Sequence, residues 1–262
     1  MIKKHLKTNR SFTITKKAAW LVVPLVAAGG LYYPLLGLAV IGIMLAMMVL
    51  GLFKGKYWCG NICPHGSLFD FVLMRLSIFK KIPVLFRSPL LKWFFFAFFM
   101  SMFSYRLGLA LGFLGETEFT TRLGAVFVNQ YLVLPTIGGV ILALAINPRT
   151  WCTFCPMGTL QKIMNKLGKQ LNINRHTEEF ITIADQESCS ECGKCARVCP
   201  MQLEPYQSWD DDQFRDESCI KCYTCINNCP SELLYSTTSS DRKFSREGSK
   251  KQEPGNKTTK VA

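Results

Sequence analysis

Long apolar segments dominate the first two thirds of the chain and predict a helical membrane domain. Residues 18–53 contain no Lys, Arg, Asp or Glu. A single transmembrane helix needs only about 20 residues, and the Gly- and Pro-containing stretch 29–34 interrupts the run. We therefore expect two helices, over residues 18–33 and 35–53, joined as a tight hairpin.

Two further apolar segments follow, over residues 90–114 and 125–146. Pro135 and the pair Gly138-Gly139 are expected to kink the fourth helix. The predicted fold class is a mainly α membrane protein, with four transmembrane helices arranged as two repeated hairpins.

Basic residues flank these helices in a pattern that predicts their orientation. Lys and Arg are frequent before residue 18, within residues 54–92 and after residue 147, and they are absent from the turn at 31–34. Because Lys and Arg accumulate on the cytoplasmic side of membrane proteins, both chain ends are expected there. The side chains of Lys16 and Lys17 are expected to snorkel to the lipid head groups. One long helix over 18–53, or a cleaved signal peptide, explains this pattern less well.

A short motif occurs twice in the membrane half, at residues 58–68 and 151–160. Both copies read W-C-x(2–3)-C-P-x-G-[ST]-L, and repeats of this kind build other membrane domains. Gly66 and Gly158 are expected in a tight turn after each Cys-Pro pair. Helices that lie on the inner membrane surface are then expected over residues 68–79 and 160–171.

The C-terminal third contains the motif C-x2-C-x2-C-x3-C-P twice, at residues 189–200 and 219–230. This is the spacing of [4Fe–4S] ligands in bacterial two-cluster ferredoxins, in which the fourth cysteine of each run binds the other cluster. We therefore predict an α+β ferredoxin-like domain with two clusters. One cluster would be held by Cys189, Cys192, Cys195 and Cys229, and the other by Cys219, Cys222, Cys225 and Cys199. Zinc sites and disulfide frameworks fit this spacing and compartment less well.

Four cysteines remain, one pair in each Cys-Pro motif: Cys59, Cys63, Cys152 and Cys155. If the two halves pack as a pseudo-twofold pair, these thiolates could meet and bind a third iron–sulfur cluster, zinc or Cu(I). They could also work as redox-active dithiols, or serve only as small buried residues. The sequence leaves these alternatives open.

Charge divides the chain into two unlike parts. The only acidic residues among residues 1–177 are Asp70, Glu116 and Glu118, whereas residues 178–217 are strongly acidic. The net charge of +13 does not indicate a nucleic-acid partner, because the basic residues flank apolar helices instead of forming a soluble basic surface. An acidic surface is expected to dock on a basic partner, or on the basic inner surface of the membrane half. Its residues are Glu204, Asp210, Asp211, Asp212, Asp216 and Glu217.

These patterns define the expected domains. A basic cytoplasmic N-terminus (1–17) precedes the membrane domain (18–177), and the ferredoxin-like domain (178–235) is followed by a tail (236–262). The tail is rich in Ser, Thr, Lys and Gly and is expected to be disordered.

The histidines do not indicate an intramembrane haem, since none of the three lies in an apolar segment; they are His5, His65 and His176. A quinone would therefore exchange electrons with the clusters directly. Arg106 is a weak candidate for a quinone site, because intramembrane charges are commonly functional. It could instead snorkel or pair with Glu116 or Glu118. His65 is the other weak candidate, since it could relay a proton or simply face solvent.

The order of these features resembles the membrane subunit of the quinol dehydrogenase that feeds periplasmic nitrate reductase. Related proteins include the membrane core of the nitrous-oxide reductase maturation protein. The resemblance covers roughly residues 15–235 and rests on the eight ferredoxin cysteines and on Cys59, Cys63, Pro64, Cys152, Cys155 and Pro156. It implies a protein of the bacterial inner membrane that oxidises quinol and delivers electrons to an anaerobic respiratory reductase. The larger relatives carry an outer flavin domain, for which the short connection between the first two expected helices leaves no room, so the resemblance does not identify a periplasmic acceptor.

Two functions follow. The first is a membrane-bound iron–sulfur protein that carries electrons between the quinone pool and another iron–sulfur or cytochrome protein. The second is an assembly factor, whose four membrane-proximal cysteines reduce or pass copper or iron for a respiratory metalloenzyme. Electron direction, the partner and the oligomeric state are not determined by the sequence. It shows no nucleotide, flavin or nucleophile motif, so any catalysis is expected to be redox chemistry.

Overall fold

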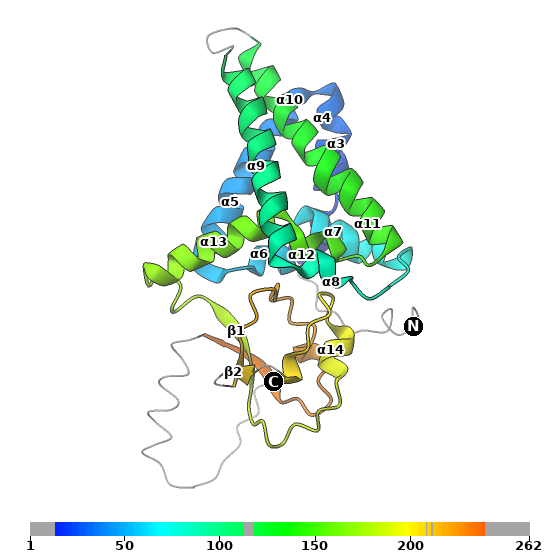
Figure 1. Ribbon diagram of the computed structural model, residues 1–262, viewed down its shortest axis with the longest axis vertical. Helices are drawn as coiled ribbons and strands as arrows, with labels where there is room; N and C mark the ends of the chain where they lie inside the picture. Colours follow the sequence, from blue (N-terminus) through cyan, green and yellow to red (C-terminus); the bar gives the residue numbers. More distant parts are fainter. Residues whose placement is uncertain (1–13, 113–117, 208, 211, 239–262) are drawn as a thin grey trace.

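In the computed structural model, four long apolar helices stand on a small mixed domain (Figure 1). The structure describes residues 14–112, 118–207, 209–210 and 212–238. Within these residues, four segments are long and apolar enough to cross a membrane: Ile14–Tyr32, Pro34–Lys54, Pro89–Leu111 and Phe119–Ala145. The prediction of four membrane-spanning helices is thus confirmed by length and composition.

Each span is built from one or more helices. The first comprises α2 (Ile14–Ala19), α3 (Val22–Ala27) and α4 (Gly29–Tyr32), and the second η1 (Pro34–Leu38) and α5 (Ala39–Lys54). The third is α9 (Pro89–Leu111), and the fourth comprises α10 (Phe119–Tyr131), the π-helical segment η3 (Leu132–Gly138) and α11 (Gly139–Ala145). The first two spans meet at Tyr33, which agrees with the expected tight turn. That the second hairpin is a structural repeat of the first remains a prediction.

The first hairpin contacts the fourth span through glycine. A Cβ atom on Gly37 would lie 2.0 Å from the carbonyl oxygen of Gly124, and one on Gly124 would lie 2.2 Å from that of Pro34. The backbones of η1 and α10 therefore approach more closely than any larger residue permits, as is common where membrane helices pack through small residues.

The expected irregularity of the fourth span takes the form of the π-helical segment around Pro135. Proline has no N–H group, so the carbonyl of Tyr131 loses its usual partner four residues later. The Thr136 hydroxyl donates to that carbonyl instead, at 2.8 Å. Single π turns of this kind often occur at functional sites.

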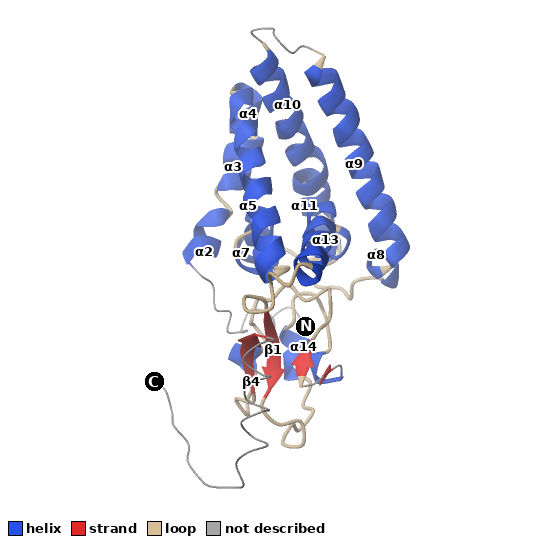
Figure 2. Cartoon of the chain, turned by 90° about the vertical axis from the view of Figure 1, so that its left-hand side faces the viewer, coloured by secondary structure: helices blue, strands red, loops and turns tan. Residues whose placement is uncertain are grey.

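Short helices form the end of the bundle that faces the small domain (Figure 2). They are α6 (Tyr57–Asn61), α7 (Pro64–Phe71), η2 (Leu73–Arg75), α8 (Val84–Arg87), α12 (Thr150–Phe154) and α13 (Pro156–Gln170). The predicted surface helix 68–79 was wrong in its bounds, because α7 begins earlier and ends at Phe71. The predicted turns at Gly66 and Gly158 were also wrong. Both glycines lie inside helices that begin at the preceding proline, since proline suits the first helical position.

The second predicted surface helix is α13, and it packs on α5 through Gln161, Met164 and Gly168. Gln161 and Gly168 are buried, and a Cβ on Gly168 would lie 2.2 Å from the Leu52 carbonyl oxygen. Leu167 and Leu171 are 41% and 57% exposed. The apolar face of α13 is thus partly left for lipid.

The C-terminal module, residues 178–238, contains a four-stranded antiparallel sheet in the order β2-β3-β1-β4. Its elements are β1 (Glu179–Ile183), α14 (Lys194–Val198), η4 (Pro205–Gln207), β2 (Trp209–Asp210), β3 (Gln213–Phe214), η5 (Ile226–Asn228) and β4 (Leu234–Thr238). Ile181, Phe214 and Leu234 form its core together with Cys225. The predicted domain end at residue 235 was wrong, because β4 pairs with β1 as far as Thr238. The rest of the expected disordered tail lies outside the described residues, as does most of the N-terminal segment.

The module is joined to the membrane half by several direct hydrogen bonds. Asn61 Nδ2 donates to the Lys221 carbonyl at 3.0 Å, and the N–H group of Ile82 donates to Gln202 Oε1 at 2.9 Å. A Cβ on Gly60 would lie 2.1 Å from the Ile220 carbonyl oxygen. The backbone of α6 and the backbone at Ile220 are therefore in contact at this point.

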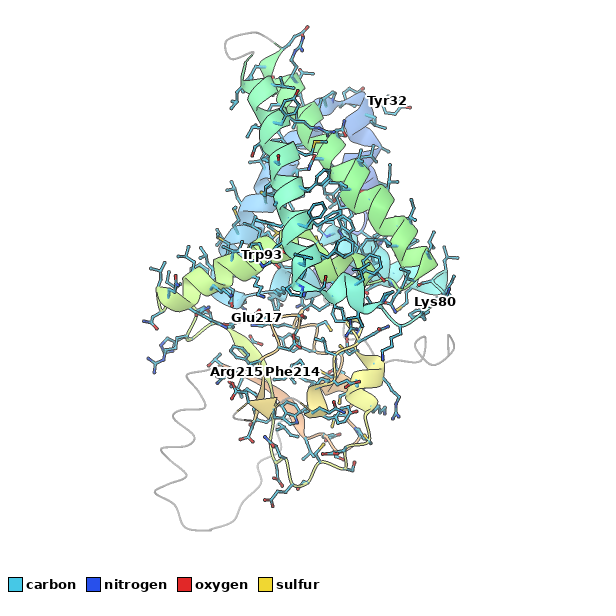
Figure 3. The ribbon with its side chains drawn as sticks, viewed as in Figure 1. Tyr32, Lys80, Trp93, Phe214, Arg215 and Glu217 are labelled. Atoms are coloured by element: carbon cyan, nitrogen blue, oxygen red, sulfur yellow. The ribbon has the colours of Figure 1, made fainter. Side chains whose placement is uncertain are left out.

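Charged groups reinforce the same junction. Glu178 of the module, which is 5% exposed, pairs with Lys169 of α13 at 3.5 Å. Its other partner, Lys221, lies in the module at 2.8 Å and donates to the Lys54 carbonyl at 3.2 Å. Glu217 lies between the module and α13 (Figure 3) and pairs with Lys162. Of the acidic surface predicted to dock, Glu217 thus contacts the basic face of the membrane half. By contrast, Asp210 pairs with Arg215 and Asp212 accepts from Gln186 within the module.

We expect Gly60→Ala to loosen the module from the membrane half, because the added methyl group meets backbone and not a flexible side chain. Overpacking of this kind costs about 1–3 kcal/mol. Hydrogen exchange should quicken around residues 57–62 and 218–222. Gly42→Ala is the matched control, since nothing lies within 4 Å of its Cβ position. Equal exchange in the two variants would contradict the proposed contact.

Candidate metal centres

The two cysteine runs of the module share one unusual backbone conformation. Three equivalent positions in the two runs have positive φ angles: Glu191 (47°) and Lys221 (53°), Gly193 (64°) and Tyr223 (55°), and Gln202 (53°) and Glu232 (53°). Five of these six residues are not glycine, and left-handed backbone at such residues costs about 1 kcal/mol or more each. Turns of this type direct successive N–H groups into one concavity, which suits an anionic group such as an iron–sulfur cluster.

Two cavities in the module are each lined by four cysteines. One is lined by Cys189, Cys192, Cys195 and Cys229, and the other by Cys199, Cys219, Cys222 and Cys225. The fourth cysteine of each run therefore lies with the first three of the other, in the arrangement that the ferredoxin rule predicts. The role of these cysteines as ligands remains a prediction.

The spacing of these side chains suits a cluster better than a single ion. Within the described parts of the chain, no three His, Cys, Asp or Glu side chains are close enough to hold one metal ion. A [4Fe–4S] cluster spreads its four thiolates over four iron atoms, whereas tetrahedral zinc draws four ligands to one point. The eight cysteines thus fit two iron–sulfur clusters.

A third cavity, of about 120 Å³, lies at the end of the helix bundle that faces the module. All four membrane-proximal cysteines line it: Cys59, Cys63, Cys152 and Cys155. Cys63 and Cys155 have nearly the same backbone angles, φ −51° and ψ 121° against φ −55° and ψ 128°. The structure therefore brings the two Cys-Pro motifs together in equivalent conformations.

Burial controls the chemistry of these thiols. It raises the pKa of Cys59 and Cys63, and it raises that of Cys155 to about 12. The backbone N–H groups of the residues two and three positions after Cys63 and Cys155 act in the opposite direction and lower these pKa values. A buried thiol loses its proton readily only when a metal or cation compensates the charge. The site fits metal-bound thiolates better than a dithiol switch, which needs an accessible thiolate.

A buried ion-pair network beside these cysteines was missed by the sequence analysis. Arg149 is 1% exposed, and its guanidinium donates to both Asp70 carboxylate oxygens, at 3.1 and 2.6 Å. It also donates to the carbonyl of Cys59 at 3.2 Å and to Cys152 Sγ at 3.5 Å. The expectation that Lys16 snorkels was wrong, because its Nζ pairs with Asp70 at 2.8 Å and the residue is 5% exposed.

The position of Arg149 in this network explains why residue 66 of the first Cys-Pro motif is glycine. A Cβ on Gly66 would lie 2.8 Å from Arg149 Nη1, so glycine makes room for the guanidinium. Burial alone would lower the pKa of Arg149, but Asp70 and Cys152 raise it above its ordinary value, so the side chain stays charged. A signal for this network was present in the sequence. Asp70 is the only acidic residue before Glu116, and a lone carboxylate among apolar helices needs a cationic partner.

His65 lines the third cavity and is 8% exposed, so the alternative in which it faces solvent was wrong. Its Nε2 lies 2.9 Å from Thr136 Oγ1. Because the Thr136 proton is given to the Tyr131 carbonyl, Nε2 carries the hydrogen and donates. Burial lowers the pKa of His65 to about 3. The ring is therefore neutral at physiological pH.

Arg106 is not among the residues that line the cavity. Its Nη1 donates to Asn129 Oδ1 at 3.1 Å. Glu118, one of its expected partners, pairs instead with Arg122 at 3.1 Å, and Glu116 lies outside the described residues. The structure thus gives Arg106 no direct contact with the cysteine site.

Comparison with known proteins supports iron–sulfur binding in both halves. The family model described as "4Fe-4S binding domain" matches residues 36–83 and again 129–174. The model described as "4Fe-4S dicluster domain" matches residues 181–230. Together the matches include all twelve cysteines of the chain. An iron–sulfur protein with membrane-spanning helices is the description they support, and it fits an electron-transfer protein.

Two uncharacterized proteins of Methanocaldococcus jannaschii are also similar. One is 28% identical over 171 residues, which cover 63% of this chain and 60% of the relative. The other is 24% identical over 170 residues, 61% of this chain and 65% of the relative. The chain thus spans less than two thirds of either relative. No solved structure matches it significantly. None of these comparisons identifies the quinol dehydrogenase family, so that resemblance remains a prediction.

We expect Asp70→Asn to destabilise the membrane half by about 3–5 kcal/mol, because it leaves the buried Arg149 and Lys16 charges without a full counter-charge. Thermal unfolding in detergent would show a clearly lower midpoint. Glu118→Gln breaks an exposed pair with Arg122 and should change stability by no more than about 1 kcal/mol. Similar midpoints for the two variants would show that the buried network is not needed.

Proposed function

We propose that the protein is a membrane-bound iron–sulfur carrier that moves electrons between the quinone pool and a soluble iron–sulfur or cytochrome partner. The observation that carries this proposal is that the twelve cysteines gather in three groups of four, each around its own cavity. We infer that Cys59, Cys63, Cys152 and Cys155 hold a third [4Fe–4S] cluster. Such clusters supply one-electron transfer.

The contacts between the three groups support a linear electron path. Gly60 follows Cys59 and touches Ile220, which follows Cys219. The membrane group therefore lies next to the group that contains Cys219. That group in turn lies near the remaining one, because Cys195 is close enough to raise the pKa of Cys225.

The far end of this path reaches the surface, because Cys192 is exposed. Exchange with a soluble partner belongs at this end, and exchange with quinone belongs at the membrane end. The sequence resemblance suggests that the partner serves an anaerobic respiratory reductase.

The arrangement of the helices supports the proposed topology. The start of the first span and the module lie at the same end of the bundle, and Tyr32 lies at the other end (Figures 1 and 3). This arrangement, together with the basic residues that flank the spans at the end of the bundle facing the module, favours a cytoplasmic location of both chain ends. The membrane would then be the cytoplasmic membrane of a bacterium or archaeon.

The alternative function, metal handling for another enzyme, is less well supported. A thiol site that passes copper or iron needs access for the receiving protein and a reactive thiolate. The pKa values of Cys59, Cys63 and Cys155 are raised by burial, and their cavity lies within the end of the helix bundle. A fixed cofactor fits these features better than transfer of a metal.

Iron content tests the number of clusters. Anaerobically purified protein should contain about 12 Fe per chain, and Cys59→Ala or Cys152→Ala should reduce this to about 8. Cys199→Ala should instead disturb the cluster of the Cys219 run and leave that of the Cys189 run, as seen by electron paramagnetic resonance. About 8 Fe in the unaltered protein would overturn the third cluster.

Reduction by quinol tests the function itself. Each quinol releases two electrons and two protons, so it can reduce two oxidised clusters by one electron each. Absorbance near 400 nm should fall when a short-chain menaquinol is added to oxidised protein. Exchange with the quinone pool would be ruled out if dithionite reduces the clusters, quinol does not reduce them, and quinone does not oxidise the reduced clusters.

A further inference from the structure

The cavity at the membrane-proximal cysteines is larger than a cluster site requires. Its volume is about 120 Å³, whereas the two cysteine cavities of the module have volumes of about 30 and 20 Å³. The additional space extends away from the cysteines, into the membrane bundle between α5, α9 and α10. Its apolar wall is formed by Val40, Met44, Met47, Phe99, Phe103 and Phe127.

Two polar side chains in this wall have atoms without a partner. Gln130 Nε2 and the Tyr131 hydroxyl are buried and make no hydrogen bond within the described residues. The residues are only 7% and 9% exposed. Of the side chains with such unpaired atoms, these two are the ones that line the cavity. An unpaired buried polar group is costly, so a pair of them at one cavity points to a ligand that accepts hydrogen bonds.

The surrounding structure holds Tyr131 in place. Gln130 and Tyr131 are the last two residues of α10, directly before the π-helical segment. The Tyr131 carbonyl is bound by Thr136, and the His65 ring lies 4.5 Å from the Tyr131 ring. The two donors therefore come from consecutive residues at the end of one helix, and they line the same cavity as the four cysteines.

We propose that this cavity binds the ring of a quinone or quinol, with Gln130 Nε2–H and Tyr131 O–H donating to its oxygen atoms. The inference rests on the proposed function, and it names the residues that would receive the membrane substrate. The wall is apolar and aromatic, as ligand pockets commonly are, with a few polar groups that fix orientation. A lipid acyl chain has no acceptor and would leave both donors unpaired.

The test is binding of a short-chain menaquinone analogue to the purified holoprotein, followed by quenching of Trp fluorescence, since Trp58 and Trp151 line the cavity. Tyr131→Phe removes one donor and keeps the ring, and Gln130→Met removes the other at similar volume. The Kd should rise about 3- to 10-fold in each variant, as expected for loss of one hydrogen bond. Iron content and the cluster spectrum should stay unchanged.

Matched controls exist for both variants. Tyr105→Phe and Gln170→Met make the same chemical changes at exposed positions outside the cavity, and should leave the Kd unchanged. If quinol reduces the clusters but the two cavity variants bind as tightly as the controls, this site is wrong while the proposed function stands. Loss of iron in Tyr131→Phe or Gln130→Met would also overturn the proposed quinone site, since the substituted residue would then support the cysteine site. Unaltered protein that neither binds quinone nor is reduced by quinol would instead refute the proposed function.

Discussion

Negative charge cannot be buried at the end of an apolar helix bundle without positive charge close by. The membrane-proximal cysteines meet this constraint through Arg149, which contacts Cys152 Sγ and the Cys59 carbonyl. Asp70 holds the guanidinium through both carboxylate oxygens, and Lys16 adds a second cation. These residues come from the first span, from α7 and from the segment before α12. One charge network therefore ties three distant parts of the membrane half to the cysteines.

The local geometry at the cysteines follows from a simpler rule. Each of the four Cys-Pro cysteines, Cys63, Cys155, Cys199 and Cys229, has an extended backbone with ψ between 119° and 128°. A residue before proline is driven away from helical angles. Backbone N–H groups of the segment that follows lower the pKa of Cys63 and Cys155, and the Leu203 N–H group donates to Cys199 Sγ at 3.5 Å. The same dipeptide thus shapes a ligand position in the membrane half and in the module.

The junction of the two halves is what makes a continuous electron path plausible. Gly60 and Ile220 meet backbone to backbone, and each is adjacent in sequence to a cysteine of its own group. The polar contacts around them, including the Lys169–Glu178 pair and the hydrogen bond from Lys221 Nζ to the Lys54 carbonyl, fix the module against the bundle. A looser attachment through surface charges alone would not set the distance between the groups.

The amino-acid sequence determined the features whose causes are local. Charge-free length defined the four spans, and cysteine spacing defined the two module groups, because most ligands of one cluster lie in a single loop. Even the exchange of the fourth cysteine followed from a spacing rule, and the cavities lined by Cys189 and Cys219 agree with it. The sequence could not place Asp70 against Arg149, or Gln130 and Tyr131 on the cavity beside Cys59. It also could not show that Gly168 of α13 meets Leu52 of α5. Those arrangements depend on how separate helices approach one another. Such contacts join residues far apart in the chain, and no periodic pattern within one segment specifies them.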